Sequence, residues 1–191
     1  MLDHSCQVQR APLAERKDDL YGTPPEATRA LLQAEKLPLR LWEPCAGRGA
    51  IVDVLRGAGH EVIASDLVDY GQPTHFTRRD FLMERKTPDG CEAIVTNPPF
   101  KLAEEFVGHA LELCPRVIML LRLAFYESDR RSGILENCGL ARIHAFRKRL
   151  PMMNRDGWTG PKANSGMAFA WYIWDRSHCG PTTIHRISWE K

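Results

Sequence analysis

The segment Asn97-Pro98-Pro99-Phe100 carries the residue types in this chain best suited to chemistry. Two successive prolines after the apolar run at residues 91–96 fix the backbone and leave carbonyl groups without competing local N–H donors. If the Asn97 side-chain oxygen and the Pro98 carbonyl accept the two hydrogens of a planar amine, its nitrogen lone pair is aimed at an electrophile. Phe100 could then stack on the attached ring. A plain strand-ending turn is the alternative interpretation.

A second group of residues suits a nucleotide-like ligand. Gly47 and Gly49 follow an expected strand and precede an expected helix, and such glycines let the backbone approach a ligand beside the free N–H groups of a helix start. Asp66 lies 19 residues beyond Gly47, at the end of the next expected strand, where a carboxylate can accept both hydroxyls of a ribose. Together these residues predict a nucleoside site, although each alone is also typical of a tight turn.

The elements that must position these residues follow an α/β pattern, in which short apolar runs alternate with amphipathic stretches. A helix is expected to begin after Thr23, run through Leu32 and close at Pro38. Three more helices are expected, at 50–56, 102–113 and 128–136. Strands are expected at 39–43, 60–65, 91–96, 116–121, 141–146 and 168–174. Because parallel strands end at one edge of their sheet, the glycine turn, Asp66 and Asn97 are expected on the same rim.

Composition indicates one soluble globular domain over residues 1–191, with 43% hydrophobic and 26% charged residues, and with residues 1–20 expected to be flexible. No apolar run approaches the roughly 18 residues of a membrane span, and the start lacks the pattern of a signal peptide, so a cytoplasmic location without membrane contact is expected. The six cysteines lack metal-ligand spacing, which favours free thiols and no bound metal. Oligomeric state is not indicated.

The later part of the chain is basic. Residues 116–191 hold 13 lysines and arginines against six acidic residues, whereas residues 1–115 hold 13 against 18. This asymmetry suggests a polyanionic partner, although a solvated face is the common alternative. Basic and aromatic residues alternate in a predicted substrate-contacting loop at 147–165, and the candidate contacts are Arg122, Arg147, Lys148, Arg149, Trp158 and Lys162. An ordinary loop anchored by Trp158 is the other interpretation.

Four motifs occur in a diagnostic order: Glu43-Pro44-x-x-Gly47-x-Gly49, Asp66, Asp80-Phe81 and Asn97-Pro98-Pro99-Phe100. In this order they resemble the motifs of class I S-adenosylmethionine (SAM) dependent amino-methyltransferases, most of all the adenine-N6 nucleic-acid type. The resemblance covers about residues 21–125 and implies a Rossmann-like, doubly wound, largely parallel seven-stranded sheet whose last strand is reversed.

The resemblance also implies roles for individual residues. The SAM contacts it implies are Thr23, Glu43, Ala46 and Gly47 around the methionine half, Asp66 at the ribose, and Asp80 with Phe81 at the adenine. Pro44 and Gly49 complete the implied cofactor-binding set. The implied acceptor site consists of Asn97, Pro98, Pro99 and Phe100.

The favoured hypothesis is SAM-dependent methylation of adenine N6 in DNA. The same reaction on RNA, methylation of a protein glutamine amide, and a noncatalytic SAM-binding subunit stay open as alternatives. Methyl transfer from a sulfonium is an in-line displacement that depends on alignment and desolvation, so no catalytic histidine is expected.

Overall fold

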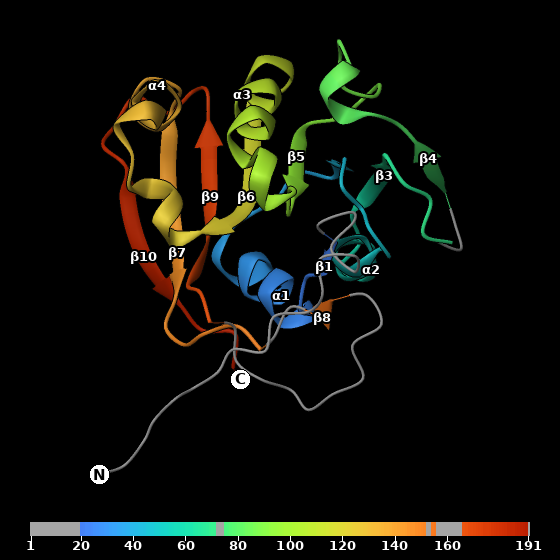
Figure 1. Cartoon of the computed structure of the whole chain (residues 1–191), viewed down its shortest axis with the longest axis horizontal. Coiled ribbons are helices and arrows are strands. Elements are labelled where there is room, and N and C mark those ends of the chain that lie inside the picture. The colour runs from blue at the N-terminus through green and yellow to red at the C-terminus, as the bar shows by residue number, and fades with distance from the viewer. Residues whose placement is uncertain (1–19, 72–74, 152–153, 156–165, 191) are drawn as a thin grey trace.

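The computed structural model describes residues 20–71, 75–151, 154–155 and 166–190. Within these residues, one large sheet has eight strands in the order β10-β7-β9-β6-β5-β2-β3-β4, and β1 pairs with β8 in a small separate sheet (Figure 1). The strands are β1 (Tyr21–Gly22), β2 (Arg40–Glu43), β3 (Glu61–Asp66), β4 (Phe76–Arg78), β5 (Ala93–Thr96), β6 (Arg116–Arg122), β7 (Leu140–Phe146), β8 (Asn154–Arg155), β9 (Phe169–Asp175) and β10 (Thr183–Ile187).

Strand direction brings most carboxyl ends to one edge of the large sheet. Strands β2 to β6 pair in parallel, β9 runs antiparallel to both β6 and β7, and β10 runs parallel to β7. The expected reversed strand is therefore present as β9. All the other strands of this sheet end at the same edge, called here the carboxyl rim.

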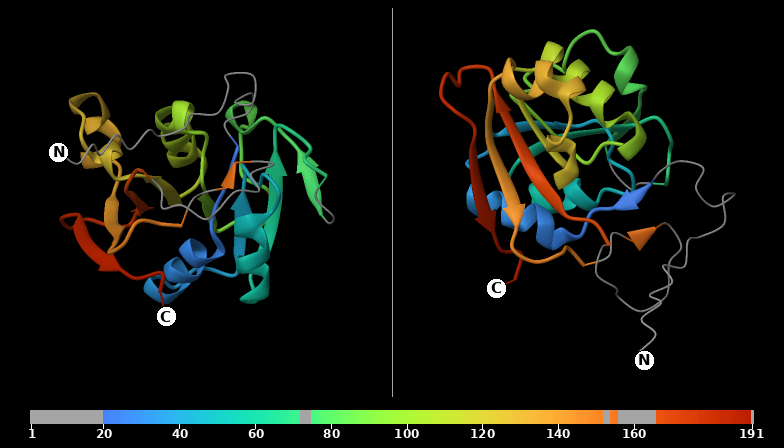
Figure 2. Two further views of the ribbon diagram at one scale, coloured as in Figure 1. Left: turned by 60° about the horizontal axis from the view of Figure 1, so that its bottom comes forward. Right: turned by 60° about the vertical axis from the view of Figure 1, so that its left-hand side comes forward.

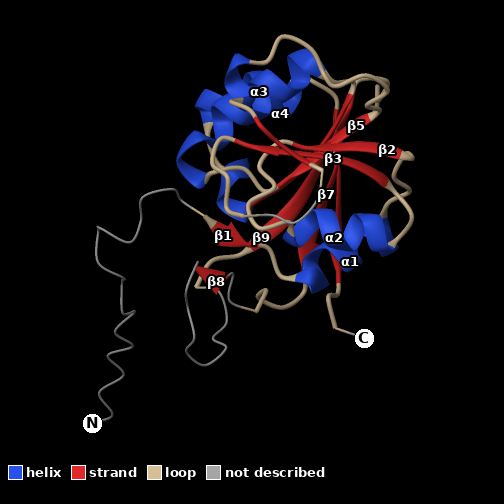
Figure 3. Ribbon diagram, turned by 90° about the vertical axis from the view of Figure 1, so that its right-hand side faces the viewer, coloured by secondary structure: helices blue, strands red, loops and turns tan. Residues whose placement is uncertain are grey.

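The sheet is buried on both faces by helices. Figure 3 shows α1 (Pro25–Ala34) and α2 (Ala50–Gly57) on one face, and α3 (Ala103–Leu113) and α4 (Ser132–Glu136) on the other. Alternate residues of each central strand enter two separate apolar layers, for example Leu41 in the first and Trp42 in the second. This double burial explains why β6 is almost continuously apolar. The expected doubly wound α/β fold is confirmed.

Strand β9 attaches a helix to each face through its tryptophans. Trp171 and Trp174 are fully buried. The Trp171 indole N–H donates to the Ala27 carbonyl of α1 at 2.9 Å, and the Trp174 indole N–H donates to the Ile134 carbonyl of α4 at 2.8 Å. Each ring therefore buries a large apolar area while its one polar atom stays satisfied.

Two helix boundaries differ from the sequence-based expectation. Helix α1 ends at Ala34, before Pro38, because the chain is already extended at Glu35. The helix expected at 128–136 is instead a short 3-10 turn, η5 (Asp129–Arg131), followed by the five residues of α4. Among the described residues, no helix is long and apolar enough to cross a membrane.

The expectation of seven strands is wrong, since β10 adds an eighth beyond β7 at the edge of the sheet (Figure 2). Residues Thr183–Ile187 include only two apolar side chains and are mostly exposed, with Ile184 59% exposed. An edge strand open to water on this scale lacks the apolar run by which the other strands are recognised in sequence.

A buried carboxylate joins α1 to the sheet. Glu35, just after α1, accepts hydrogen bonds from Arg142 at 2.5 and 3.0 Å, from Arg116 at 3.2 Å, and lies 2.7 Å from His144 Nε2. Burial works against ionisation of Glu35, but the hydrogen bonds from His144 and Arg142 outweigh it and lower the Glu35 pKa to about 2.

Candidate active site

The carboxyl rim gathers the residues that the motifs predicted. Strand β2 ends at Glu43, β3 at Asp66 and β6 at Arg122, while Asn97 follows directly after β5. The parallel pairing of β3, β2, β5 and β6 places these ends side by side. The tertiary structure thus brings the glycine turn, the carboxylate and the proline loop to a common edge.

The glycine turn is held close to both β3 and α2. Gly47 and Gly49 have positive φ angles of 53° and 86°, which disfavour any side chain, and Gly49 caps α2. A Cβ atom on Gly47 would lie 2.8 Å from the Leu20 side chain. Ala46, which is buried, donates its N–H to the Ser65 carbonyl at 2.9 Å. The turn is therefore fixed as a narrow backbone cradle at the start of a helix.

Asp66 faces this cradle. Its Oδ2 accepts the Gly47 N–H at 2.9 Å, and its Oδ1 accepts the Val68 N–H at 3.1 Å. An ionised carboxylate has acceptor sites for several hydrogens, and Asp66 lies where it could bond the hydroxyl groups of a ligand in the cradle. The predicted proximity of Gly47 and Asp66 is therefore present.

Glu43 lies under the turn and is fully buried. Its Oε1 accepts the Thr96 hydroxyl in a short hydrogen bond and the Cys45 N–H at 3.1 Å. Its Oε2 is buried without a partner among the described residues. Burial raises the Glu43 pKa to about 8. A buried carboxyl oxygen without a partner favours a cationic ligand, and the ammonium at the methionine end of SAM has that charge.

Asn97 has a fixed orientation. Its Nδ2 donates to Thr23 Oγ1 at 3.1 Å and to the Tyr21 carbonyl at 3.5 Å, whereas its Oδ1 is buried without a partner among the described residues. Because the nitrogen is engaged, the oxygen is the atom left to accept a hydrogen. The Pro99 carbonyl accepts the Leu102 N–H at 3.0 Å, which starts a 3-10 turn, η3 (Phe100–Leu102).

Phe100 contacts three side chains. Its ring stacks on Tyr21 with 4.9 Å between centroids, lies 5.6 Å from the ring of Phe169, and has the Arg122 guanidinium carbon 4.7 Å from its centroid. Arg122, predicted as a substrate contact, therefore covers the ring of Phe100 that was predicted to stack on a base. Tyr21 already fills a stacking position on that ring.

The Asp80-Phe81 pair lies after β4. Phe81 is 2% exposed, and its ring contacts the aromatic rings of Trp42, Phe106 and His109. The ring is thus part of the core, which leaves backbone atoms as the groups through which Phe81 can reach a ligand. Asp80 is exposed, and its Oδ1 accepts the Leu82 N–H at 3.1 Å at the start of the 3-10 turn η2 (Phe81–Met83).

The predicted substrate loop is described only in part. Arg147, Lys148 and Arg149 are exposed just after β7, at the carboxyl rim, and line a hollow of about 590 Å³. Trp158 and Lys162 lie outside the described residues.

Sequence reasoning missed two residues that touch the site. Thr96 links Glu43 to the strand that carries Asn97, and Tyr21 contacts both Asn97 and Phe100. The position of Thr96, directly before Asn97 at the end of a strand, was a signal for it. Tyr21 carried no comparable signal, because its contacts arise from residues more than 70 positions away.

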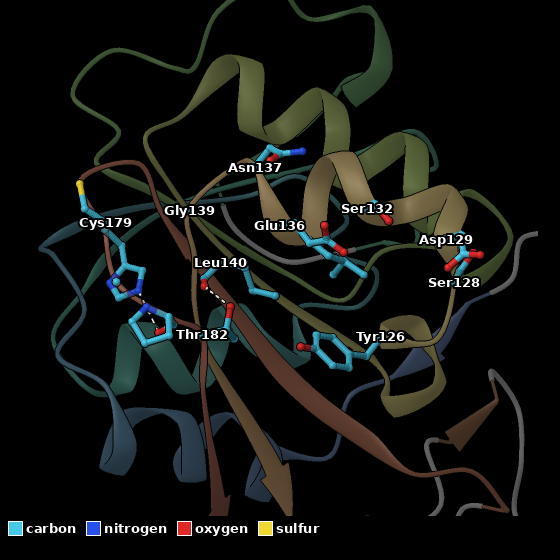
Figure 4. A pocket seen from close by; sticks show the side chains of 14 residues that line it. Tyr126, Ser128, Asp129, Ser132, Glu136, Asn137, Gly139, Leu140, Cys179 and Thr182 are labelled. Atoms are coloured by element: carbon cyan, nitrogen blue, oxygen red, sulfur yellow. Dashed lines mark hydrogen bonds between the residues drawn. The ribbon is translucent and has the colours of Figure 1, made fainter.

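A second hollow, of about 580 Å³, lies beside α4 and the connection from β9 to β10 (Figure 4). Leu140 begins β7 and Thr182 precedes β10, so this hollow reaches the edge opposite the carboxyl rim. Polar groups there bond to one another, as with the Thr182 hydroxyl, which donates to the Leu140 carbonyl at 2.7 Å. None of the predicted site residues is among the described residues that line this second hollow.

No protein-family profile and no curated protein sequence matches the chain. Solved structures do. A protein described as an RNA methyltransferase from Pyrococcus horikoshii is 15% identical, with a TM-score of 0.60 over 87% of this chain and 91% of that one. A protein described as the modification subunit of a type I restriction enzyme from Vibrio vulnificus YJ016 is 14% identical, with a TM-score of 0.60 over 87% of this chain. The match spans 47% of that subunit.

The 23S rRNA methyltransferase ErmE is 16% identical, with a TM-score of 0.52 over 83% of this chain and 70% of that one. These likenesses, at low sequence identity, concern architecture. The chain has the Rossmann-like fold of class I methyltransferases, with an additional edge strand.

Proposed function

We propose that this protein is a SAM-dependent methyltransferase that modifies the exocyclic N6 amine of adenine in nucleic acid, with DNA as the favoured substrate. The observation that carries the proposal is Asn97 Oδ1, a buried acceptor with no partner in the described part of the chain, on a proline loop beside the glycine cradle. An amine bound to an aromatic ring has a delocalised lone pair, so it reacts only when its geometry is imposed.

The residues around the cradle have separate tasks in binding. Bound SAM supplies a methyl group on a positively charged sulfur. Glu43 would pair with the methionine ammonium through Oε2, which has no partner among the residues that the structure describes. The Gly47 backbone would approach the cofactor closely, and Asp66 would accept the ribose hydroxyls.

The acceptor loop aligns the reaction. Asn97 Oδ1 and the Pro98 carbonyl would accept the two amine hydrogens, which directs the nitrogen lone pair towards the methyl group. Bound SAM would supply the methyl group with a neutral thioether, S-adenosylhomocysteine, as the leaving group that keeps the C–S electron pair, and the methylated nitrogen would lose its surplus proton to water. Alignment and exclusion of water supply the rate, so the site has no need for a general base.

Charge supports a nucleic-acid substrate. The basic residues 147–149 and Arg122 lie on the same rim as Asn97, and a cluster of cations at an active site attracts phosphate groups. Similar folds in proteins described as acting on RNA and in a restriction-modification subunit agree with this substrate class. A glutamine amide is also planar and fits the same acceptor atom, so the experiment must separate the two.

The test uses methyl-labelled SAM with separate pools of duplex DNA, single-stranded DNA, total RNA and cell protein, followed by digestion and identification of the product. N6-methyladenine in DNA is the expected result. The same product in RNA alone would move the substrate to RNA, and label only in protein would replace adenine with a side-chain amide. SAM binding without label in any pool would indicate that the protein is a noncatalytic SAM-binding subunit.

Asn97→Ala tests the acceptor role directly. We expect transfer to be lost, by about a hundredfold or more, while the Kd for SAM changes little, because Oδ1 acts on the amine. Asn137→Ala, at an exposed position beside the second hollow, is the matched control and should behave as wild type. Loss of SAM binding in Asn97→Ala would contradict the assigned role.

A further inference from the structure

Strand β10 brings residues 189–190 to the carboxyl rim. Strand β10 pairs in parallel with β7, with Ile187 opposite Phe146, and Arg147 N–H donates to the Ile187 carbonyl at 2.9 Å. The chain therefore leaves β10 at the same edge at which it leaves β7. Trp189 and Glu190, just beyond the end of β10, therefore lie at the rim beside the basic segment 147–149.

Trp189 is held in one position there. Its indole N–H donates to the Lys148 carbonyl at 3.1 Å, and the half-buried ring packs against the apolar layer that contains α1 and α2. Phe146 packs against the same layer. Both side chains also line the hollow of about 590 Å³ described above, a size typical of small-ligand sites.

This hollow continues from the acceptor loop. Phe169 lines the hollow, and its ring lies 5.6 Å from the ring of Phe100. Leu123, next to Arg122, lines it as well, and Arg122 covers Phe100. The hollow thus begins one aromatic ring away from the predicted acceptor site.

The chemistry of the lining is that of a nucleotide site. Arg147, Lys148 and Arg149 offer cations to phosphate, and Trp189 and Phe146 offer aromatic surface to a base. Among the described residues of the lining one is acidic: Glu190 pairs with Lys148 at 2.6 Å, and the two side chains are 41% and 66% exposed. An exposed pair of this kind is weak, so a phosphate can replace the carboxylate at little cost.

We propose that this groove binds an unstacked nucleotide of the substrate strand next to the target adenine, with its base against Trp189 and its phosphate on the basic segment. The proposal rests on the proposed function for the identity of the strand. It makes β10, which lies outside the seven-stranded core, the element that supplies a flanking-nucleotide site within a single small domain.

The test measures binding of a fluorescein-labelled, adenine-containing 12-nucleotide DNA strand by anisotropy, with S-adenosylhomocysteine present. Trp189→Leu keeps an apolar side chain but loses the aromatic face, so the Kd should rise about fivefold or more, in the range measured for one stacked base. Trp189→Phe should stay close to wild type. Ile184→Ala, an exposed position on the same strand outside the groove, is the control for damage to β10.

Glu190→Gln gives a change in the opposite direction. It frees Lys148 for phosphate, so the oligonucleotide should bind more tightly and the plot of log K against log salt should become steeper by about 0.7. This readout holds even if Trp189→Leu fails to fold. The proposal that the groove binds a nucleotide would be overturned by either of two results. One is unchanged affinity and salt slope in Glu190→Gln, and the other is a folded Trp189→Leu that binds as wild type.

The methylation assay separates the two proposals. If adenine is methylated but the Trp189 and Glu190 variants bind as wild type, the groove is wrong and the proposed function stands. If the variants change binding as expected but the label appears on no adenine, the groove stands and the adenine-N6 assignment falls.

Discussion

Binding of SAM should release a proton from Glu43. In the ligand-free protein the Glu43 pKa is raised to about 8 by burial, and its Oε2 has no partner among the described residues. An ammonium group placed beside that oxygen favours the ionised carboxylate and returns the pKa towards its ordinary value. The perturbation is therefore simply the addition of cofactor.

The size of the effect follows from the pKa. At pH 7 a group with a pKa of about 8 is about 90% protonated, so binding should release about 0.9 proton; the release should fall to about 0.5 at pH 8 and about 0.1 at pH 9. The α-amino group of free SAM takes up a small fraction of a proton near pH 7, since its own pKa is about 8. A Glu43→Gln variant shows this uptake alone.

The assay is calorimetric titration of SAM at pH 7 in buffers with different ionisation enthalpies. The slope of observed enthalpy against buffer enthalpy gives the number of protons exchanged. Wild type and Glu43→Gln should differ by about 0.9 proton. Equal slopes in the two proteins would refute the assignment of Glu43 as the partner of the ammonium, whatever the affinities.

Three further predictions concern cofactor, substrate and stability. Asp66→Ala should raise the Kd for SAM about tenfold or more, because two backbone N–H groups and the ligand lose a charged acceptor, while Asp69→Ala, at an exposed position after β3, should not. Replacing residues 147–149 by glutamine should weaken nucleic-acid binding and flatten its salt dependence, and an unchanged salt slope would assign the segment to structure. Glu35, with a pKa of about 2 against 4.5 for the free side chain, stabilises the fold above about pH 4.5, and that contribution is lost as the pH falls towards 2. In urea unfolding, the stability gap between wild type and Glu35→Gln should therefore shrink on acidification; a constant gap would contradict this.

The expected fold follows from local pattern because its central strands and helices are strongly periodic. The near-continuous apolar run of β6 requires burial on two faces, and the strand-turn-helix at the glycine turn requires a parallel neighbour. The edge of the sheet is different. Strand β10 forms because its backbone hydrogen-bonds to β7 along the edge of the sheet. Its side chains are mostly exposed, so its sequence gives little sign of a strand.

The candidate site divides in the same way. Residue types determined the predicted chemistry: Gly47 and Gly49 need backbone angles that side chains disfavour, and the two prolines after Asn97 constrain the loop through their rings. These are properties of single residues and their neighbours in the chain, so the sequence alone contains them.

Tertiary structure decided which atoms are left to react. The Oδ1 of Asn97 has no partner among the described residues because the side-chain nitrogen is the atom that bonds Thr23, 74 positions away, and the raised pKa of Glu43 depends on its burial in the folded chain. The position of Trp189 depends on β10 joining β7 in parallel. Burial and hydrogen bonds between distant segments exist only once the chain is folded. Spacing along the sequence could therefore identify the candidate site residues, but not which of their atoms are bonded or which groups are protonated.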